Sequence, residues 1–318
     1  MLIRDRLLVL LLIGFSSAAA AAGRIHFLIP GGAGGGWDST ARGVGEALAR
    51  SGIIDVASYE NLSGGGGARA LAHMIETAER QQNTLMISSS PIILRSLRKI
   101  YPQSFRDLVP VASVVVDYGA FVVKNDSPYR TWQDLIDDFS RDPRHVNVAG
   151  GSSRASMDHI VAALAFRKSG ADAKKVKYIP YNAGGHAMVG LLSGETQVLS
   201  TGLSEAIGLA DQGEVRILAI TAPERLKHFP EVPTLTEQGV PAVFANWRGF
   251  FAAPGTSPEQ LEQFEEELSA MFTTDEWQTI RDNRGWTDFF LSGDEFAAFL
   301  VRQEQELAEL LGELGLLN

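Results

Sequence analysis

Residues 31–36, with the sequence GGAGGG, stand between an apolar run and an amphipathic helical pattern that begins near Asp38. Because glycine lacks a Cβ, its backbone adopts positive φ freely and lets another molecule approach the amides closely. Unpaired N–H groups and the dipole at the start of a helix favour an anion at such a position. Gly34, Gly35 and Gly36 are therefore candidates for binding an anionic group; the alternative is a tight strand-to-helix turn without a ligand.

The spacing of these glycines does not match two common nucleotide-binding motifs. A G-x-G-x-x-G sequence starting at Gly32 requires a glycine where Trp37 stands. Gly31 and Gly36 have the spacing of P-loop glycines, but Trp37 replaces the lysine that would neutralise phosphate. Trp37 itself is either a core residue or an apolar wall beside the binding site.

A second group of polar side chains lies at 150–159, in the sequence GGSSRASMDH. Ser152, Ser153 and Ser156 supply three hydroxyl groups, and Arg154 adds a positive charge. A serine at the start of a helix often serves only as an N-cap. Three hydroxyls and a cation in one loop favour a polar ligand.

This loop does not have the spacing of a catalytic site. The nucleophile motif G-x-S-x-G requires a glycine where Arg154 stands. Asp158 and His159 are adjacent, so on a helix they point about 100° apart and cannot form a base–orienter pair. Helix packing is the better interpretation of His159. The six histidines include no H-E-x-x-H motif, and we expect no metal site, no cofactor and no enzymatic activity.

Two further charged residues each allow a structural and a functional interpretation. Asp38 can satisfy loop amides as a first-turn carboxylate and can pair with Arg42 at i,i+4, which favours a structural role over ligand contact. Arg248 follows Trp247 in a β-rich segment. It can pair with a carboxylate of the ligand or with an internal acid.

The order strand, small-residue loop, amphipathic helix recurs along the chain and predicts an α/β fold with largely parallel sheets. In open α/β sheets, ligands bind beyond the carboxyl ends of the strands, and each of these loops lies at such an end. Several helix starts aimed at one cleft would form an anion site. The five loops are GGAGGG at 31–36, GGGG at 64–67, SSSP at 88–91, GGSSRAS at 150–156 and AGG at 183–185.

Two β-rich segments far apart in the sequence, at 111–124 and 246–259, predict two lobes joined by a double hinge. Residues 23–123 and 248–318 would form lobe 1. Residues 124–247 would form lobe 2.

The N-terminal sequence is typical of a secretory signal peptide, which we expect to comprise residues 1–22. Arg4 and Arg6 precede an apolar run and an alanine tract, and the run is short for a membrane span. The chain has no cysteine, so neither disulfides nor a lipid anchor on cysteine is expected, and the protein should be free in a periplasm. A formal net charge of −10 argues against nucleic acid and anionic membranes as partners.

From about Arg24 to the C-terminus, nearly the whole chain after the signal peptide, the sequence resembles the periplasmic receptors of tripartite tricarboxylate transporters, the TctC or Bug family. The segments that carry the resemblance include PGGAGGGWDSTAR, ENLSGGGGARALA, VNVAGGSSRASMDH, VKYIPYNAGGHAMVGLLSGE and NWRGFFAAPGTSPE. GGGWD, ANWRG and GWTDFFLSGDEFAAFL are most similar to the tricarboxylate-binding branch.

The resemblance implies a monomeric, two-lobed clamshell of the type II periplasmic-binding-protein kind, which holds a citrate-like carboxylate between its lobes. It also implies delivery to a membrane permease of one large and one small subunit; the alternative partner is a sensor kinase. Ser88 and Ser89 would face the first glycine loop, and Tyr181, Asn182 and Gly184 would lie near the serine loop. Arg69 and Arg154 depart from the family pattern, which is explained either by an extra negative charge on the ligand or by solvent exposure.

Overall fold

The computed structural model describes residues 23–317, and the expected signal peptide at 1–22 lies outside the described residues. The strands are β1 (Gly23–Ile29), β2 (Ile54–Asn61), β3 (Thr84–Ser89), β4 (Val109–Lys124), β5 (Asn147–Gly150), β6 (Lys177–Pro180), β7 (Val198–Gly202), β8 (Val215–Ile220), β9 (Ala245–Ala252) and β10 (Thr287–Ser292). The helices are α1 (Gly36–Arg50), α2 (Ala68–Glu76), α3 (Pro91–Leu97), α4 (Trp132–Arg141), α5 (Met157–Lys168), α6 (Gly184–Leu192), α7 (Leu203–Asp211), α8 (Pro258–Met271), α9 (Asp275–Asn283) and α10 (Gly293–Leu314).

The strands pair in the order β2-β1-β3-β9-β4-β7-β5-β6, and β8 and β10 also pair with β4. Pairing is parallel between β1 and β2, β1 and β3, β5 and β6, and β5 and β7. It is antiparallel wherever β4 or β9 takes part. The expectation of largely parallel sheets is therefore corrected to mixed sheets, because β4 and β9 cross the molecule in opposite directions.

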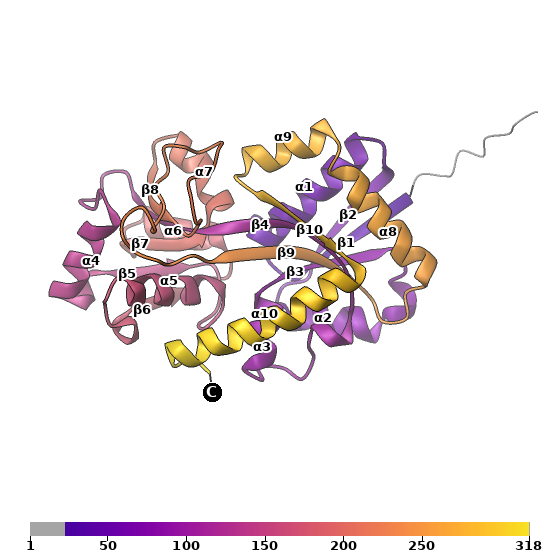
Figure 1. The fold of residues 1–318 in the computed structure, drawn as a ribbon, viewed down its shortest axis with the longest axis horizontal. Helices are drawn as coiled ribbons and strands as arrows, with labels where there is room; N and C mark the ends of the chain where they lie inside the picture. Colours follow the sequence, from indigo (N-terminus) through magenta and orange to yellow (C-terminus); the bar gives the residue numbers. More distant parts are fainter. Residues whose placement is uncertain (1–22, 318) are drawn as a thin grey trace, which may run out of the picture.

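β4 is shared by two halves of the molecule. Its residues 109–118 pair with β9, and residues 119–124 pair with β7 and β8. Figure 1 shows β4 and β9 running side by side from the half that holds β1–β3 to the half that holds β5–β8. The lobe boundaries at 123/124 and 247/248 stay a prediction.

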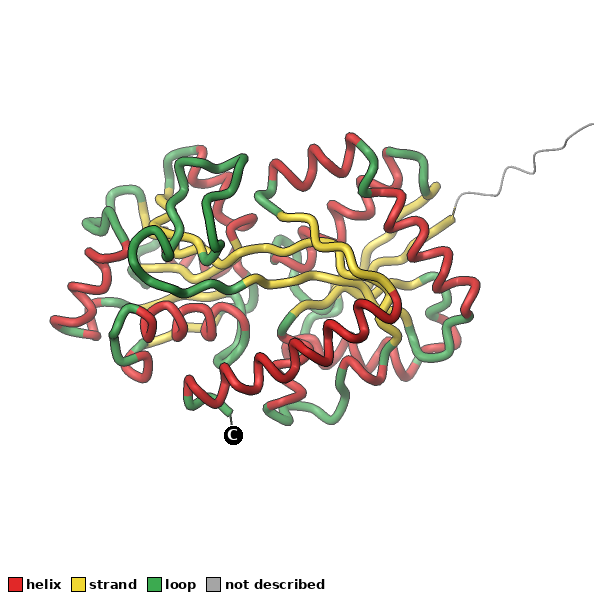
Figure 2. Tube along the Cα trace, in the orientation of Figure 1, coloured by secondary structure: helices red, strands yellow, loops and turns green. Residues whose placement is uncertain are grey.

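Helices cover the sheets of both halves, and Figure 2 shows the strands running through the middle of each half. In one half Trp132 of α4 packs between Phe121 and Phe166, with ring centroids 4.4 and 5.3 Å away. In the other, Phe27 of β1 packs against Phe250 of β9 at 5.5 Å. Each half thus has aromatic packing, and one hydrophobic cluster, which includes Leu28, Phe121 and Trp132, extends across both halves.

Local sequence explains where the helices start. Thr131 caps α4 by accepting from the Asp134 N–H, while the Asp134 carboxylate accepts from the Thr131 N–H at 2.9 Å. Helix α5 positions the serine loop. It is buried along most of its length, as its apolar sequence requires. It packs against β5 and β7, which fixes the serine loop at its N-terminal end.

Candidate ligand-binding site

A cavity of about 780 Å³ lies between the two halves, at the carboxyl ends of the strands. All five small-residue loops recognised in the sequence contribute to its lining. The crossing strands β4 and β9 supply side chains as well, and so does the turn between β7 and α7. The segments that contribute are 30–37, 63–66, 89–95, 151–158, 180–186 and 202–205, with Asp117, Asn246 and Arg248. The shared location of these loops follows from the rule that strand ends meet at one edge of a sheet.

Most of the residues expected at the site line this cavity. They are Gly35, Gly36, Trp37, Ser89, Ser152, Ser153, Ser156, Tyr181, Asn182, Gly184 and Arg248. Gly34, Asp38, Ser88 and Arg154 are absent from the lining within the described residues. Their places follow from contacts made elsewhere.

Asp38 is buried and fully engaged by its own loop and helix. It accepts hydrogen bonds from the Gly34 N–H at 2.9 Å, from Arg42 Nε at 2.9 Å and from Asn61 Nδ2 at 3.0 Å. Burial opposes its charge, but these hydrogen bonds outweigh that effect and hold the pKa of Asp38 below its ordinary value. The pairing with Arg42 expected from the i,i+4 spacing is confirmed. Gly34 has a φ of +78°, a backbone conformation that residues with a side chain rarely adopt.

Ser88 and Arg154 lie beside the cavity without lining it. Ser88 is buried and, like Trp37, lines a second, smaller hollow. Arg154 is exposed, and its guanidinium donates to the Tyr178 carbonyl at 3.0 Å. Trp37 donates from Nε1 to Ser89 Oγ at 2.9 Å, so this ring forms a fixed wall of the cavity.

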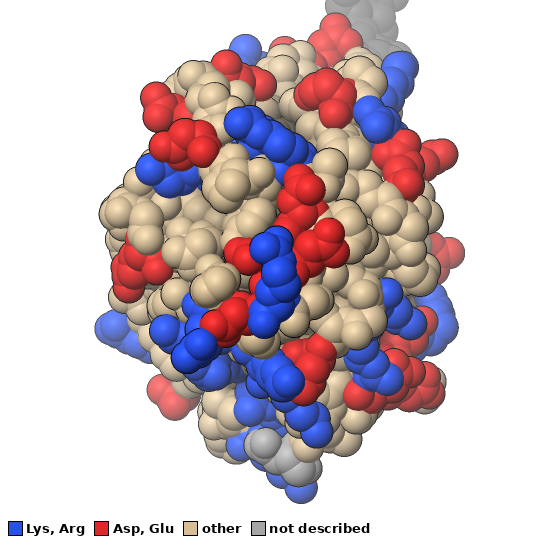
Figure 3. All heavy atoms as spheres, turned by 90° about the vertical axis from the view of Figure 1, so that its left-hand side faces the viewer, with Lys and Arg blue, Asp and Glu red and all other residues tan. Residues whose placement is uncertain are grey.

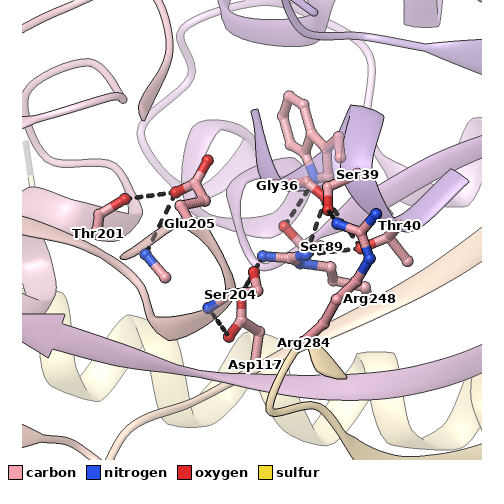
Figure 4. A network of polar contacts seen from close by, with 12 residues as sticks. Gly36, Ser39, Thr40, Ser89, Asp117, Thr201, Ser204, Glu205, Arg248 and Arg284 are labelled. Atoms are coloured by element: carbon pink, nitrogen blue, oxygen red, sulfur yellow. Dashed lines mark hydrogen bonds and ion pairs between the residues drawn. The ribbon is translucent and has the colours of Figure 1, made fainter. Parts of the chain in front are cut away.

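The sequence left open whether Arg248 pairs with the ligand or with an internal acid, and in the structure it pairs with an internal acid. Its guanidinium forms an ion pair with Asp117 of β4 and donates to the Gly36 carbonyl at 2.8 Å and to Thr40 Oγ1 at 2.6 Å (Figure 4). A Cβ at Gly36 would stand 2.5 Å from Arg248 Nη2, so only glycine fits there. The Asp117 carboxylate also accepts from Ser204 Oγ at 2.7 Å. The charge of Arg248 is thus largely neutralised within the protein.

Arg95 is a cavity residue that the sequence analysis did not identify. It lies in α3, is only 6% exposed, and donates weakly to Ser153 Oγ at 3.4 Å. Among residues 23–317, no carboxylate lies within ion-pair distance of it. The 63–66 loop packs directly over it, since a Cβ at Gly66 would stand 2.1 Å from Arg95 Cζ. Burial lowers the pKa of Arg95, yet a guanidinium stays protonated in proteins. Arg95 is therefore a cation available to an anionic ligand.

Two acids also line the cavity: Glu205, which was missed from the sequence, and Asp158, which was considered there only as a catalytic acid. Glu205, at the start of α7, accepts hydrogen bonds from Thr201 Oγ1 and from the Gly202 N–H at 3.3 Å. Burial raises the pKa of Glu205. Burial and the neighbouring Glu205 raise the pKa of Asp158 to about 7, against the hydrogen bond from Ser152. The strand–glycine–helix sequence LSTGLSE carried a signal for this sixth loop.

A family model described as the tripartite tricarboxylate transporter family receptor matches residues 39–316. This chain belongs to that family. The receptor is 27% identical to Protein BugT of Bordetella pertussis over 296 residues, which cover 92% of this chain and 89% of BugT. A protein of Pseudomonas sp. strain P51 from the tcbD-tcbE intergenic region is 26% identical over 251 residues, 77% of this chain and 72% of that protein.

Solved structures share the fold of the receptor. Rpa4515 of R. palustris with adipate superposes with a TM-score of 0.83 at 21% identity, covering 92% of this chain and 97% of that chain. MatC of Rhodopseudomonas palustris with bound malate gives 0.77 at 20% identity, covering 91% and 99%. The periplasmic binding protein BugD gives 0.82 at 19% identity, covering 92% and 98%. The predicted family and the two-lobed periplasmic-binding-protein fold are confirmed.

His159 of the receptor has a packing role, as its sequence context indicated. The ring is buried, accepts a hydrogen bond from the Ala155 N–H at 2.8 Å and packs on Tyr178 with ring centroids 4.7 Å apart. Burial lowers the pKa of His159 to about 4. The ring is therefore neutral near pH 7 and adds no charge beside the serine loop.

Residues 23–317 contain no group of three or more His, Cys, Asp or Glu side chains placed to hold a metal ion. The same residues contain no helix that combines the length and the apolar character of a membrane span.

Proposed function

We propose that this receptor captures a small carboxylate, citrate or a related tricarboxylate, in the cavity between its lobes. It acts in the periplasm and hands the ligand to a membrane permease of one large and one small subunit. Family membership supports the transport role. The malate and adipate named for two structures of the same fold support a carboxylate as the ligand.

The observation that carries the proposal is the buried guanidinium of Arg95. Every other buried charge that faces the cavity has its own protein partner or is itself an acid, whereas Arg95 has only a weak bond to Ser153. An arginine fork matches a carboxylate with two parallel hydrogen bonds. A ligand carboxylate would supply the negative charge that Arg95 does not receive from residues 23–317.

The polar groups of the cavity, Arg95 included, can provide a micromolar dissociation constant. A micromolar dissociation constant corresponds to about 8 kcal/mol, and a hydrogen bond to a charged group contributes roughly 1.5–3 kcal/mol. Arg95, the amides of the glycine loop and the hydroxyls of Ser152 and Ser156 can supply four or five such bonds. A cavity of about 780 Å³ also leaves room for bridging waters.

We propose further that lobe 1 is formed by 23–123 with 248–318, and lobe 2 by 124–247. Loops of both lobes line the cavity, so a ligand that contacts both favours the closed form. Hinge bending near the crossing strands β4 and β9 would then close the cavity and present the closed form to the permease.

The test is isothermal titration of the purified receptor with citrate, aconitate, tricarballylate, succinate and glutamate. We expect citrate or a related polycarboxylate to bind with micromolar affinity. Replacing Arg95 by methionine should weaken binding at least 30-fold, because the methionine fills the space without a charge. Arg50→Met is the matched control, since Arg50 lies exposed in the last turn of α1, and should leave affinity unchanged. Binding of an uncharged solute alone, or full affinity in Arg95→Met, would contradict the proposal.

A further inference from the structure

The cavity contains two acids that a purely anion-binding site does not require. Asp158 and Glu205 both line it, and neither has an ion-pair partner among the described residues. The third acid, Asp117, differs from them because Arg248 neutralises it. The charge of Glu205 raises the pKa of Asp158, and the charge of Asp117 raises the pKa of Glu205. Glu205 has a structural role through Oε2, which accepts from the Gly202 N–H at the start of α7, but this role does not involve its Oε1.

Glu205 is placed between the two lobes. Its Oε2 takes the hydrogen bonds from Thr201 and Gly202, and Figure 4 shows the other carboxylate oxygen directed away from Thr201. A Cβ at Gly184 would stand 2.5 Å from Oε1, and one at Gly35 would stand 4.0 Å from it. Glu205 Oε1 is therefore an acceptor held beside loops of both lobes.

Glu205 is half-buried, but several fully buried polar atoms of the cavity lining have no hydrogen-bond partner within residues 23–317. They include Ser156 Oγ, in a residue 1% exposed, and Asn246 Oδ1, in a residue 7% exposed. Buried polar groups in folded proteins are almost always hydrogen-bonded, so these atoms indicate a polar ligand. Asn246 Oδ1 can only accept, and so can Glu205 Oε1 when the carboxylate is ionised. The cavity thus has acceptors that need a donor from the ligand.

Arg95 and Glu205 lie beside different loops of the cavity. Arg95 lies under Gly66 and beside Ser153, whereas Glu205 lies beside Gly184 and Gly35. A ligand bound through a carboxylate to Arg95 extends other groups toward the remaining lining. A second ionised carboxylate next to Glu205 would be repelled, whereas a hydroxyl or ammonium group would donate to Oε1.

We propose that Glu205, with Asp158 beside it, makes the receptor selective for carboxylates that also carry a hydrogen-bond donor, a hydroxyl or an ammonium group. This inference rests on the proposed function and narrows its ligand class. A site built to hydrogen-bond a donor rejects the analogue that lacks it, because its own buried acceptor is then left unpaired. Hydroxycarboxylates and aminocarboxylates are the two members of the class.

The experiment compares matched ligands that differ by one donor. The pairs are citrate with tricarballylate, malate with succinate, and aspartate with succinate, each titrated calorimetrically at pH 8. We expect the donor-bearing member of at least one pair to bind 10-fold or more tightly. If malate binds more tightly than aspartate, the donor that the site recognises is a hydroxyl group. If aspartate binds more tightly, the donor is an ammonium group.

Variants then assign the selectivity to Glu205. Glu205→Gln keeps the shape but can donate to a carboxylate, so the preference should fall below about 3-fold, mainly through tighter binding of tricarballylate or succinate. Glu214→Gln, an exposed acid of the same half, changes net charge equally and should keep the preference. Gly184→Ala, whose methyl would displace Glu205, should reduce the preference, while Gly185→Ala has open space and should not.

Equal affinities within every pair, or a preference that Glu205→Gln leaves intact, would overturn this inference while the proposed function stands. Failure of all these carboxylates to bind would contradict the proposed function itself. Thermal melts of each variant separate a loss of selectivity from a loss of fold.

Discussion

Individual residues of the cavity differ in whether the protein itself satisfies their charge. Arg248 is held by Asp117 and by oxygen atoms of α1, so its role is to join elements. Arg95 has no such acid, so its charge is available to a ligand. The two arginines are both buried, and only their partners distinguish a structural cation from a binding one.

Asp158 should give the receptor a pH-dependent stability. Its pKa in the folded state is about 7, above the ordinary value of 3.8, so the folded protein holds the proton more tightly than the unfolded chain. This contribution is fully present below pH 3.8 and is lost as the pH rises through 7. Glu205, Arg248, Tyr178 and the Ser152 hydroxyl are the charged or polar groups that act on it.

The measurement is the free energy of unfolding of wild type and Asp158→Asn between pH 4 and 8. The difference between them should shift in favour of the variant as the pH rises, because asparagine carries no charge to bury. His159 acts in the opposite direction below pH 6.5, but it is present in both proteins and cancels in the difference. A difference that does not vary with pH would contradict the raised pKa.

The sequence predicted which loops line the cavity better than it predicted which individual side chains do. Glycine- and serine-rich segments after strands are local signals, and the strand-end rule brings all five to one cavity. The turn from β7 to α7 was missed because its loop is a single glycine, Gly202. Arg95 was missed because its burial depends on the 63–66 loop folding over it. Gly66 and Arg95 are 29 positions apart, and no local pattern encodes such a contact. The mixed pairing of β4 was missed for the same reason.

The ion pair of Asp117 and Arg248 ties the two crossing strands together. It joins β4 to β9, and both side chains are buried. Asp117→Asn should lower the free energy of unfolding by about 3–5 kcal/mol, because it leaves the Arg248 charge buried without its partner. Urea unfolding measures this. Asp126→Asn, an exposed acid paired with Lys124 at 3.7 Å, should change it by less than about 0.5 kcal/mol. A loss below about 1 kcal/mol in Asp117→Asn would show that the pair does not hold the strands.

The molecule as a whole works against the capture of an anion by long-range attraction. Its formal net charge is −10, and on the face in Figure 3 basic and acidic side chains lie intermixed. Attraction must therefore come from groups inside the cavity, namely Arg95 and the amides at the helix starts. Placing them between two lobes removes them from water, which strengthens each contact with the ligand.

We expect a carboxylate of the ligand to bind Arg95 while groups of both lobes contact the same ligand. A crystal structure of the receptor with the polycarboxylate that binds most tightly in titration tests it directly. We expect a ligand carboxylate within hydrogen-bond distance of the Arg95 guanidinium, with further contacts to the glycine loop at 31–36 and to residues 151–158 or 181–184. A ligand bound outside this cavity, or one that contacts a single lobe and leaves Arg95 without an anion, would contradict it.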